Sequence, residues 1–185
     1  MTRLAALTPF ERRGTRVGLL LADEDSGARS LIASQARETV EDLDVLEAED
    51  GAEAMQIGLQ LRPQLVLLDV NLPLLSGIDV AVSLRALHPE MRLALQGSDA
   101  ETYRELAGEQ CLPLFDKLDV RRTLGWLRVE AAACARSLRS LRTLSQACSG
   151  CGYGIAQAIP PERCPMCQRE SPWIHTPWRP FSGIA

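Results

Sequence analysis

Lysine is almost absent from this chain of 185 residues: 20 side chains are Lys or Arg, and Lys117 is the one lysine among them. Arginine fills every other Lys or Arg position. The arginine guanidinium is a planar fork of hydrogen-bond donors, whereas the lysine ammonium is a compact point charge. A single lysine in such a chain suggests a position where the point charge itself is needed. One lysine left by chance is the alternative, so the motifs around Lys117 decide between the two.

Long apolar runs are also missing. The chain contains no stretch of about 18 consecutive apolar residues, which excludes a transmembrane helix. The residues before Arg16 include several arginines and lack the apolar core of a secretory signal. The hydrophobic fraction of 46% and the charged fraction of 24% are those of a globular protein. We therefore expect a cytoplasmic protein with a buried core and no membrane contact.

Charge and cysteine are unevenly distributed. Residues 1–117 carry 11 Lys and Arg against 20 Asp and Glu, whereas residues 118–185 carry 9 Arg against 4 Asp and Glu. Four of the six cysteines lie close together near the end of the chain. This asymmetry indicates two parts with different roles. Because no secretory signal is present, the cysteine cluster favours metal binding over disulfides.

Short apolar runs alternate with amphipathic stretches from Arg16 to about residue 118. The predicted strands cover residues 17–22, 45–48, 65–70, 91–96 and 112–115. The predicted helices between them cover residues 28–39, 51–61, 76–87 and 101–108. Fully apolar runs such as the first and third strands are typical of strands buried on both faces. The alternation predicts an α/β fold, with a parallel sheet covered by helices on both sides.

A single long helix is predicted over residues 119–145. Its apolar positions repeat at spacings of four and three, as in a heptad, and they are Val120, Leu124, Leu127, Ala131, Cys134, Leu138 and Leu141. Such a helix would be about 40 Å long, about twice what is needed to cover five strands. We expect its first half to pack on the sheet. The second half would project, either into a dimer contact or against another part of the same chain.

Acidic residues and the lone lysine follow three of the predicted strands. Asp23 and Glu24 follow the first strand, Asp69 ends the third, and Lys117 follows the fifth. Because the carboxyl ends of parallel strands form the ligand crevice of an open sheet, these residues are expected to meet. Clustered carboxylates favour a hard divalent cation such as Mg²⁺. A carboxylate beside such a cation can attack phosphorus, and a lysine ammonium can pair with phosphoryl oxygens.

With their neighbours, these residues resemble the receiver domain of bacterial response regulators, the CheY-like family. The strings that carry the resemblance are LLLADED from Leu19, VLEAEDGAEA from Val45, PQLVLLDVNLPLLSG from Pro63 and FDK from Phe115. The resemblance covers residues 16–130. It implies a flavodoxin-like, doubly wound sheet of five parallel strands in the order 2-1-3-4-5.

The resemblance also implies roles for individual residues. Asp69 would be the phospho-acceptor, and Mg²⁺ would be bound by Asp23, Glu24, Asp69 and the backbone carbonyl of Asn71. Lys117 would contact the phosphoryl group. The implied function is that of a response regulator, which receives its phosphoryl group from a sensor histidine kinase or a phosphotransfer protein. No enzymatic activity is expected beyond phosphorylation and dephosphorylation of the aspartate.

Three positions depart from the family pattern. The fourth predicted strand ends at Gln96, where the family has a threonine or serine whose hydroxyl bonds the phosphoryl group. Leu114 stands at the aromatic switch position, and Leu118 replaces the proline that usually follows the lysine. The resemblance therefore implies the phosphorylation chemistry with an altered conformational relay. A degenerate receiver that serves as a binding scaffold is the alternative.

Two Cys-x₂-Cys pairs, formed by Cys148, Cys151, Cys164 and Cys167, predict a tetrahedral site for Zn²⁺ or Fe. The segment 148–185 is too short to form an adequate hydrophobic core, so the metal should be required for its folding. The segment resembles the rubredoxin-like, zinc-ribbon knuckles of rubrerythrin tails. Zn²⁺ is favoured over Fe because the chain contains no Glu-x-x-His di-iron motif.

These patterns predict four segments: an N-terminal extension at 1–15, a receiver domain at 16–130, a helical linker at 131–147, and a Cys₄ metal ribbon with a tail at 148–185. The first interpretation is a signalling protein that acts on a protein target of the ribbon and pairs with a second copy through the long helix. The alternative is a redox or metal-sensing protein with a rubredoxin-like iron site on a receiver scaffold. Nucleic-acid binding is disfavoured, because the arginines of the long helix lie at outer heptad positions and no helix-turn-helix pattern occurs.

Overall fold

The chain divides into two compact units, Met1–Cys134 and Ala135–Ala185. The computed structural model describes residues 16–143, 145–151, 154–156 and 161–175. The first unit contains a parallel sheet with its helices, and the second contains the four clustered cysteines.

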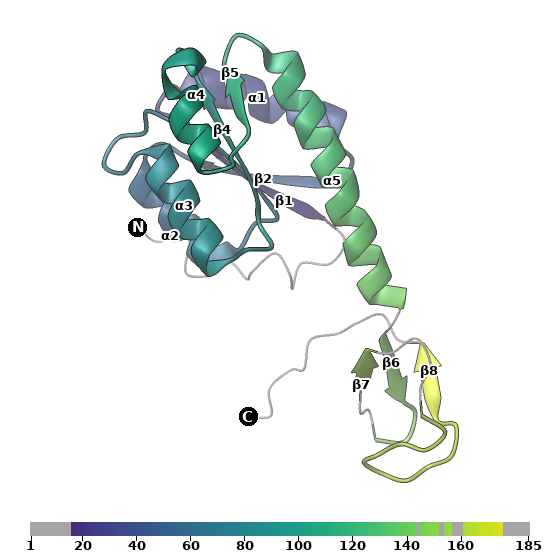
Figure 1. Cartoon of the computed structure of the whole chain (residues 1–185). Helices are drawn as coiled ribbons and strands as arrows, with labels where there is room; N and C mark the ends of the chain where they lie inside the picture. The colour runs from purple at the N-terminus through teal and green to yellow at the C-terminus, as the bar shows by residue number, and fades with distance from the viewer. Residues whose placement is uncertain (1–15, 144, 152–153, 157–160, 176–185) are drawn as a thin grey trace. The chain divides into compact units, whose positions relative to one another are not determined.

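Five parallel strands form the sheet of the first unit (Figure 1), and they are β1 (Val17–Ala22), β2 (Leu43–Ala48), β3 (Leu65–Asp69), β4 (Arg92–Gly97) and β5 (Leu114–Asp116). Their order is β2-β1-β3-β4-β5. The predicted flavodoxin-like topology is therefore confirmed. Strand order reverses between β1 and β3, and ligand sites of such sheets form at the carboxyl ends of the strands on either side of this point.

Helices cover both faces of the sheet, and they are α1 (Ser26–Thr39), α2 (Gly51–Leu61), α3 (Gly77–Leu87), α4 (Ala100–Glu109) and α5 (Val120–Thr143). The buried side chains of α2, α3 and α4 share one core cluster with alternate residues of the strands. Helices α1 and α5 lie on the opposite face (Figure 1). All residues of β1 and β3 are buried, as their unbroken apolar sequences predict.

The first four helices begin directly after a residue whose side chain accepts hydrogen bonds from backbone N–H groups of the first turn. These N-cap residues are Asp25, Asp50, Ser76 and Asp99. Such a cap satisfies donors that have no partner within the helix, at about 1 kcal/mol each. The caps fix where each loop after a strand ends, and these loops surround the carboxyl ends of the strands.

The loop after β3 is held unusually close to its neighbours. A Cβ atom at Gly77 would lie 1.9 Å from the carbonyl oxygen of Asp69, and one at Gly51 would lie 2.0 Å from that of Leu75. Backbone lies in the way in both cases, so no side chain fits at either position without moving the loop. The two glycines therefore set the path of the chain directly after Asp69.

Helix α5 is the longest element, with 24 residues. Its length is about 36 Å at the usual rise per residue. Within the first unit, the heptad positions Leu127 and Ala131 are buried, whereas Val129 is 61% exposed. The predicted single long helix is thus confirmed, although it ends two residues before the predicted position. Within the described part of the chain, no helix has the length and apolar character needed to cross a membrane.

The second unit contains a small antiparallel sheet made of β6 (Ser145–Cys148), β7 (Gly154–Ala156) and β8 (Trp173–His175), in the order β7-β6-β8. Cys148 is the last residue of β6. An isolated bridge pairs Arg163 with Glu170 on either side of the second Cys-x₂-Cys pair. The described residues of this unit therefore form a ribbon of short strands, with Cys148 at the end of β6 and the other three cysteines in connecting segments.

Candidate functional site

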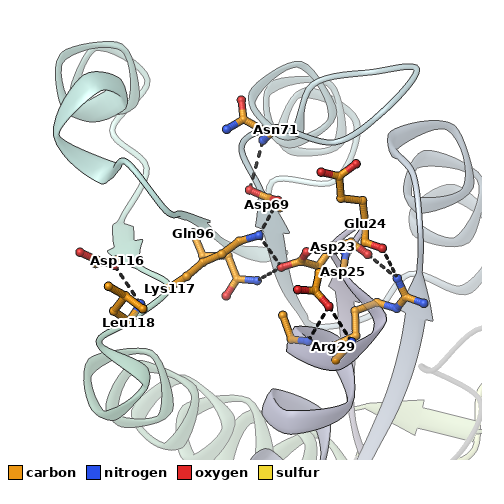
Figure 2. Close-up of polar contacts among 12 residues, drawn as sticks. Asp23, Glu24, Asp25, Arg29, Asp69, Asn71, Gln96, Asp116, Lys117 and Leu118 are labelled. Carbon is orange, nitrogen blue, oxygen red and sulfur yellow. Dashed lines mark hydrogen bonds and ion pairs between the residues drawn. The ribbon is translucent and has the colours of Figure 1, made fainter.

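The structure brings Asp23, Asp69 and Lys117 together at the carboxyl edge of the sheet (Figure 2). Asp23 directly follows β1, Asp69 is the last residue of β3, and Lys117 directly follows β5. The ammonium nitrogen of Lys117 lies 2.6 Å from Asp69 Oδ2 and 2.8 Å from Asp23 Oδ2. One lysine thus bridges two carboxylates that are 46 residues apart in the sequence.

The charged groups of this site are withdrawn from water. Asp23 is 0% exposed and Asp69 is 2% exposed, while the Lys117 side chain is 18% exposed. Burial alone would lower the pKa of Lys117, but its hydrogen bonds to Asp23 and Asp69 outweigh burial and raise it. Two buried carboxylates repel one another unless a cation lies between them. Lys117 supplies that cation here, which gives the lone lysine of the chain a definite electrostatic role.

Backbone groups orient both carboxylates. Asp23 Oδ1 accepts a hydrogen bond of 2.9 Å from the N–H of Asp25, and Asp69 Oδ1 accepts one of 3.2 Å from the N–H of Asn71. In each residue the loop holds one oxygen and leaves the other for Lys117. The two Oδ2 atoms therefore face the same point above the sheet edge.

Gln96 also belongs to the site. It is the register partner of Asp69 in β4 and is 0% exposed. Its Nε2 donates a hydrogen bond of 3.0 Å to Asp23 Oδ2. Its carbonyl oxygen Oε1 is buried and has no hydrogen-bond partner among the described residues. The sequence indicated Gln96 only as a departure from the family pattern, because nothing local to it shows that its side chain reaches Asp23.

Arg29 on α1 also belongs to the site, and no motif in the sequence indicates it. Its guanidinium donates hydrogen bonds to the backbone carbonyls of Asp23 and Glu24. Its Nε lies 3.7 Å from Glu47 Oε2 at the end of β2. Arg29 therefore ties the loop after β1 to its own helix. The position of Arg29 in the first turn of a capped helix that follows β1 could have indicated a contact with the loop before that helix.

Glu24 and Asn71 occupy the rim of the site. Both are exposed, and the Glu24 carboxylate lies apart from the Lys117 ion pairs (Figure 2). The side-chain oxygen of Asn71 accepts a hydrogen bond of 2.7 Å from the hydroxyl of Tyr103 on α4. The structure thus holds Asn71 from two sides, through its own N–H at Asp69 and through Tyr103.

The donor set at this edge fits a hard divalent cation. Asp23 and Asp69 direct carboxylate oxygens to one point, and Glu24 and the backbone carbonyl of Asn71 are close by in the sequence. Carboxylate and carbonyl oxygens are the ligands that Mg²⁺ takes, usually with several waters. Asp23 and Asp69 would hold such a cation through their carboxylate oxygens, beside the ammonium of Lys117.

Four cysteine side chains converge in the second unit. The Sγ atoms of Cys148, Cys151, Cys164 and Cys167 all lie within 4.8 Å of one another. Two pairs are closer, with Cys148 Sγ 3.4 Å from Cys167 Sγ and Cys151 Sγ 3.6 Å from Cys164 Sγ. Sulfur atoms of a tetrahedral zinc site with Zn–S bonds of about 2.3 Å are about 3.8 Å apart. The four cysteines can therefore hold a metal ion.

Backbone groups prepare this cluster for a metal. The N–H of Gly150 donates to Cys148 Sγ at 3.3 Å. Burial raises the pKa of Cys148, but hydrogen bonds from the backbone of Cys151 and Gly150 and from neighbouring thiols outweigh burial and lower it to about 6. Metal ligation requires the thiolate form. A lowered pKa is therefore what a metal-binding thiol at this position needs.

Comparison with known proteins gives a family for the first unit. Residues 19–108 match the family model of the response regulator receiver domain. The transcriptional regulatory protein PrrA of Mycobacterium tuberculosis is 29% identical over 90 residues, which cover 49% of this chain and 38% of that protein. The CpxR homolog of Haemophilus influenzae is 36% identical over 99 residues, which cover 51% and 42%. The chain thus spans about two fifths of the length of these curated relatives.

Solved structures share the fold. A DNA-binding response regulator of the LuxR family from Staphylococcus aureus has a TM-score of 0.57 at 17% identity, over 62% of this chain and 98% of that one. A CheY-like receiver domain protein from Methanospirillum hungatei has a TM-score of 0.57 at 18% identity, over 66% and 98%.

Residues 19–108 are thus similar to the response regulator receiver domain, the domain of two-component signalling, and the first unit has the fold of solved receiver domains. Such domains bind Mg²⁺, and response regulators receive their phosphoryl group from histidine kinases.

Proposed function

We propose that this protein is a cytoplasmic response regulator that accepts a phosphoryl group on Asp69 in the presence of Mg²⁺. The observation that carries the proposal is the buried cluster in which the Lys117 ammonium contacts both Asp69 and Asp23 at the carboxyl edge of the sheet. The phosphoryl donor is a sensor histidine kinase or a phosphotransfer protein.

In this proposal each residue has a separate task. A carboxylate oxygen of Asp69 attacks phosphorus, so an Asp O–P bond forms while the P–N bond to the donor histidine breaks, and the released imidazole recovers its proton. Lys117 pairs with the phosphoryl oxygens. Asp23, Glu24, Asp69 and the carbonyl of Asn71 would hold Mg²⁺, which would neutralise charge on the transferred group. The N–H of Asn71 keeps the Asp69 carboxylate oriented.

The test is phosphorylation by acetyl phosphate with Mg²⁺, followed on a gel that separates phosphorylated protein. We expect the wild-type band to shift and the Asp69→Asn band to stay in place. Asp79→Asn, an exposed acid on α3, is the matched control and should shift like the wild type. Equal shifts of the wild-type and Asp69→Asn proteins would overturn the assignment.

For the second unit we propose a Zn²⁺ site formed by Cys148, Cys151, Cys164 and Cys167. The proposed division is receiver at 16–130, helical linker at 131–147 and Cys₄ ribbon with tail at 148–185. The ribbon would contact a protein target, with α5 joining it to the receiver and also offering a contact to a second copy. The convergence of four thiols supports the metal site.

A redox or metal-sensing function is the second candidate. The observation that favours it is the all-sulfur ligand set, which suits iron as well as zinc. In that case the receiver fold would serve as a scaffold for the iron site. The visible spectrum separates the two candidates, because a Cys₄ iron site is red and a zinc site is colourless.

A further inference from the structure

Two hydrogen bonds in series connect Asp69 with helix α4. The N–H of Asn71 donates to Asp69 Oδ1 at 3.2 Å, and the side-chain oxygen of the same asparagine accepts the hydroxyl of Tyr103 at 2.7 Å. Asn71 lies in the loop after β3, and Tyr103 lies on α4. A displacement of Asn71 would therefore break or strain the hydrogen bond that Tyr103 on α4 donates to it.

Helix α4 is weakly anchored to the rest of the unit. Ala107 is its one fully buried residue, whereas α2 and α3 each bury five. A hollow of about 230 Å³ adjoins it, lined by Ala100, Arg104, Ala107, Gly108, Leu112 and Leu114. A helix with few buried contacts opens at low free-energy cost. The Tyr103 hydrogen bond to Asn71 is thus one of the few side-chain contacts that hold α4 on the rest of the unit, beside the packing of Ala107 and of the Tyr103 ring on the core.

Leu114 on β5 cannot make a polar contact of the kind that Tyr103 makes with Asn71. It lies on β5 and packs against the same core cluster as Tyr103, but it has no polar group that could bond to the pocket. Tyr103 brings both a ring that packs on the core and a hydroxyl that reaches Asn71. In this chain the polar connection therefore runs from the loop after β3 to α4.

We propose that Tyr103 is a positioning residue that couples the Asp69 pocket to helix α4 through Asn71. The inference rests on the proposed phosphorylation of Asp69. The carbonyl of Asn71 belongs to the proposed Mg²⁺ site, so loading of the pocket would act on the same residue whose side chain accepts the Tyr103 hydroxyl. The coupling is reciprocal, since any state of α4 that moves Tyr103 also moves Asn71.

Hydrogen–deuterium exchange of the full chain tests the coupling. It is measured with and without Mg²⁺ and beryllofluoride for wild type, Tyr103→Phe and Tyr153→Phe, which removes the hydroxyl of the other tyrosine. We expect exchange in α4 to change on loading in wild type and Tyr153→Phe. In Tyr103→Phe we expect α4 to exchange about fivefold faster without loading, as the loss of one exposed hydrogen bond predicts, and to change no further on loading.

A second variant removes the acceptor instead of the donor. Asn71→Ala should produce the same faster exchange in α4, and the double variant should add nothing to either single change. An α4 response to loading that persists in Tyr103→Phe overturns the inference, provided acetyl phosphate still phosphorylates that protein. Absence of phosphorylation in the wild type itself overturns the proposed function, and the coupling falls with it.

Discussion

Gln96 Nε2 donates a hydrogen bond of 3.0 Å to Asp23 Oδ2, although strand β3 lies between the strands that carry the two residues. Both side chains are completely buried. The amide thus satisfies a buried carboxylate oxygen without adding charge to a site that already contains the Lys117 ammonium. A serine or threonine has a shorter side chain than glutamine, so it is the length of Gln96 that ties β4 directly to the acidic residue after β1.

Gln96→Glu should destabilise the protein strongly, because it places a carboxyl group at hydrogen-bond distance from a buried carboxylate. We expect a loss of about 3 kcal/mol in the free energy of unfolding at neutral pH. Burial and the charge of Asp23 raise the pKa of the introduced carboxyl above its unfolded value of about 4.3. The loss is therefore small near pH 4 and grows as the pH rises.

Urea unfolding across this pH range measures the effect, with Gln60→Glu at an exposed position of α2 as the matched control. The control should remain near the wild type at every pH. A Gln96→Glu protein with the stability of the wild type at neutral pH would show that the contact with Asp23 is absent in solution.

Lys117→Arg should slow phosphorylation although the charge is kept. The ammonium nitrogen lies 2.6 and 2.8 Å from two carboxylate oxygens, in a site that a larger planar guanidinium cannot occupy in the same way. We expect the initial rate with acetyl phosphate to fall at least about tenfold, which corresponds to about 1.4 kcal/mol in the barrier. Arg121→Lys, the reverse exchange at an exposed position of α5, should leave the rate unchanged. An undiminished rate in Lys117→Arg would mean that charge alone is required.

The stability contribution of Lys117 should disappear only at high pH. Burial of its side chain lowers the pKa, but the bonds to Asp23 and Asp69 raise it above the ordinary value of 10.5. A cation with a raised folded pKa stabilises the protein fully below its unfolded pKa and loses this effect as the pH rises through the folded value. Lys117→Met should therefore be about 3 kcal/mol less stable than wild type at pH 7, and the difference should shrink above 10.5. A constant difference across this range would argue against the ion pairs.

Local sequence patterns predicted the elements well. The strand Val17–Ala22 and the helix Gly51–Leu61 begin and end where the sequence indicated. An unbroken apolar run marks the strand, and Pro63 follows the end of the helix. The start of β2 was predicted two residues late. Asp44 interrupts the apolar pattern there, and the structure accommodates it through an ion pair of 2.7 Å with Arg16.

The meeting of Asp23, Asp69 and Lys117 was also predictable, because topology alone brings the ends of parallel strands to one edge. The contacts of Gln96 and Tyr103 were not. Each contact depends on how far one side chain reaches toward a residue on another element, and the hydrophobic periodicity of the sequence does not predict such reach. The Gln96 Oε1 atom without a hydrogen-bond partner and the hollow beside α4 likewise depend on side-chain packing that the sequence does not show.

Cys148→Ser should remove the metal from the second unit. Four thiolates complete a tetrahedral shell, and loss of one leaves it open to water. We expect wild-type protein to carry one equivalent of Zn²⁺ by elemental analysis, and Cys148→Ser to carry much less. Cys111→Ser, outside the cluster, should retain the metal. Red protein containing iron would favour the redox alternative instead.

The phosphoryl group itself gives the most direct test of the central claim. After incubation with acetyl phosphate and Mg²⁺, borohydride reduces an aspartyl phosphate to homoserine, and peptide mass spectrometry identifies the altered residue. If Asp69 is the phospho-acceptor, homoserine is expected at position 69 in the wild type and at no position in Asp69→Asn. Homoserine at Asp23 or another carboxylate, or its absence at position 69, would contradict it.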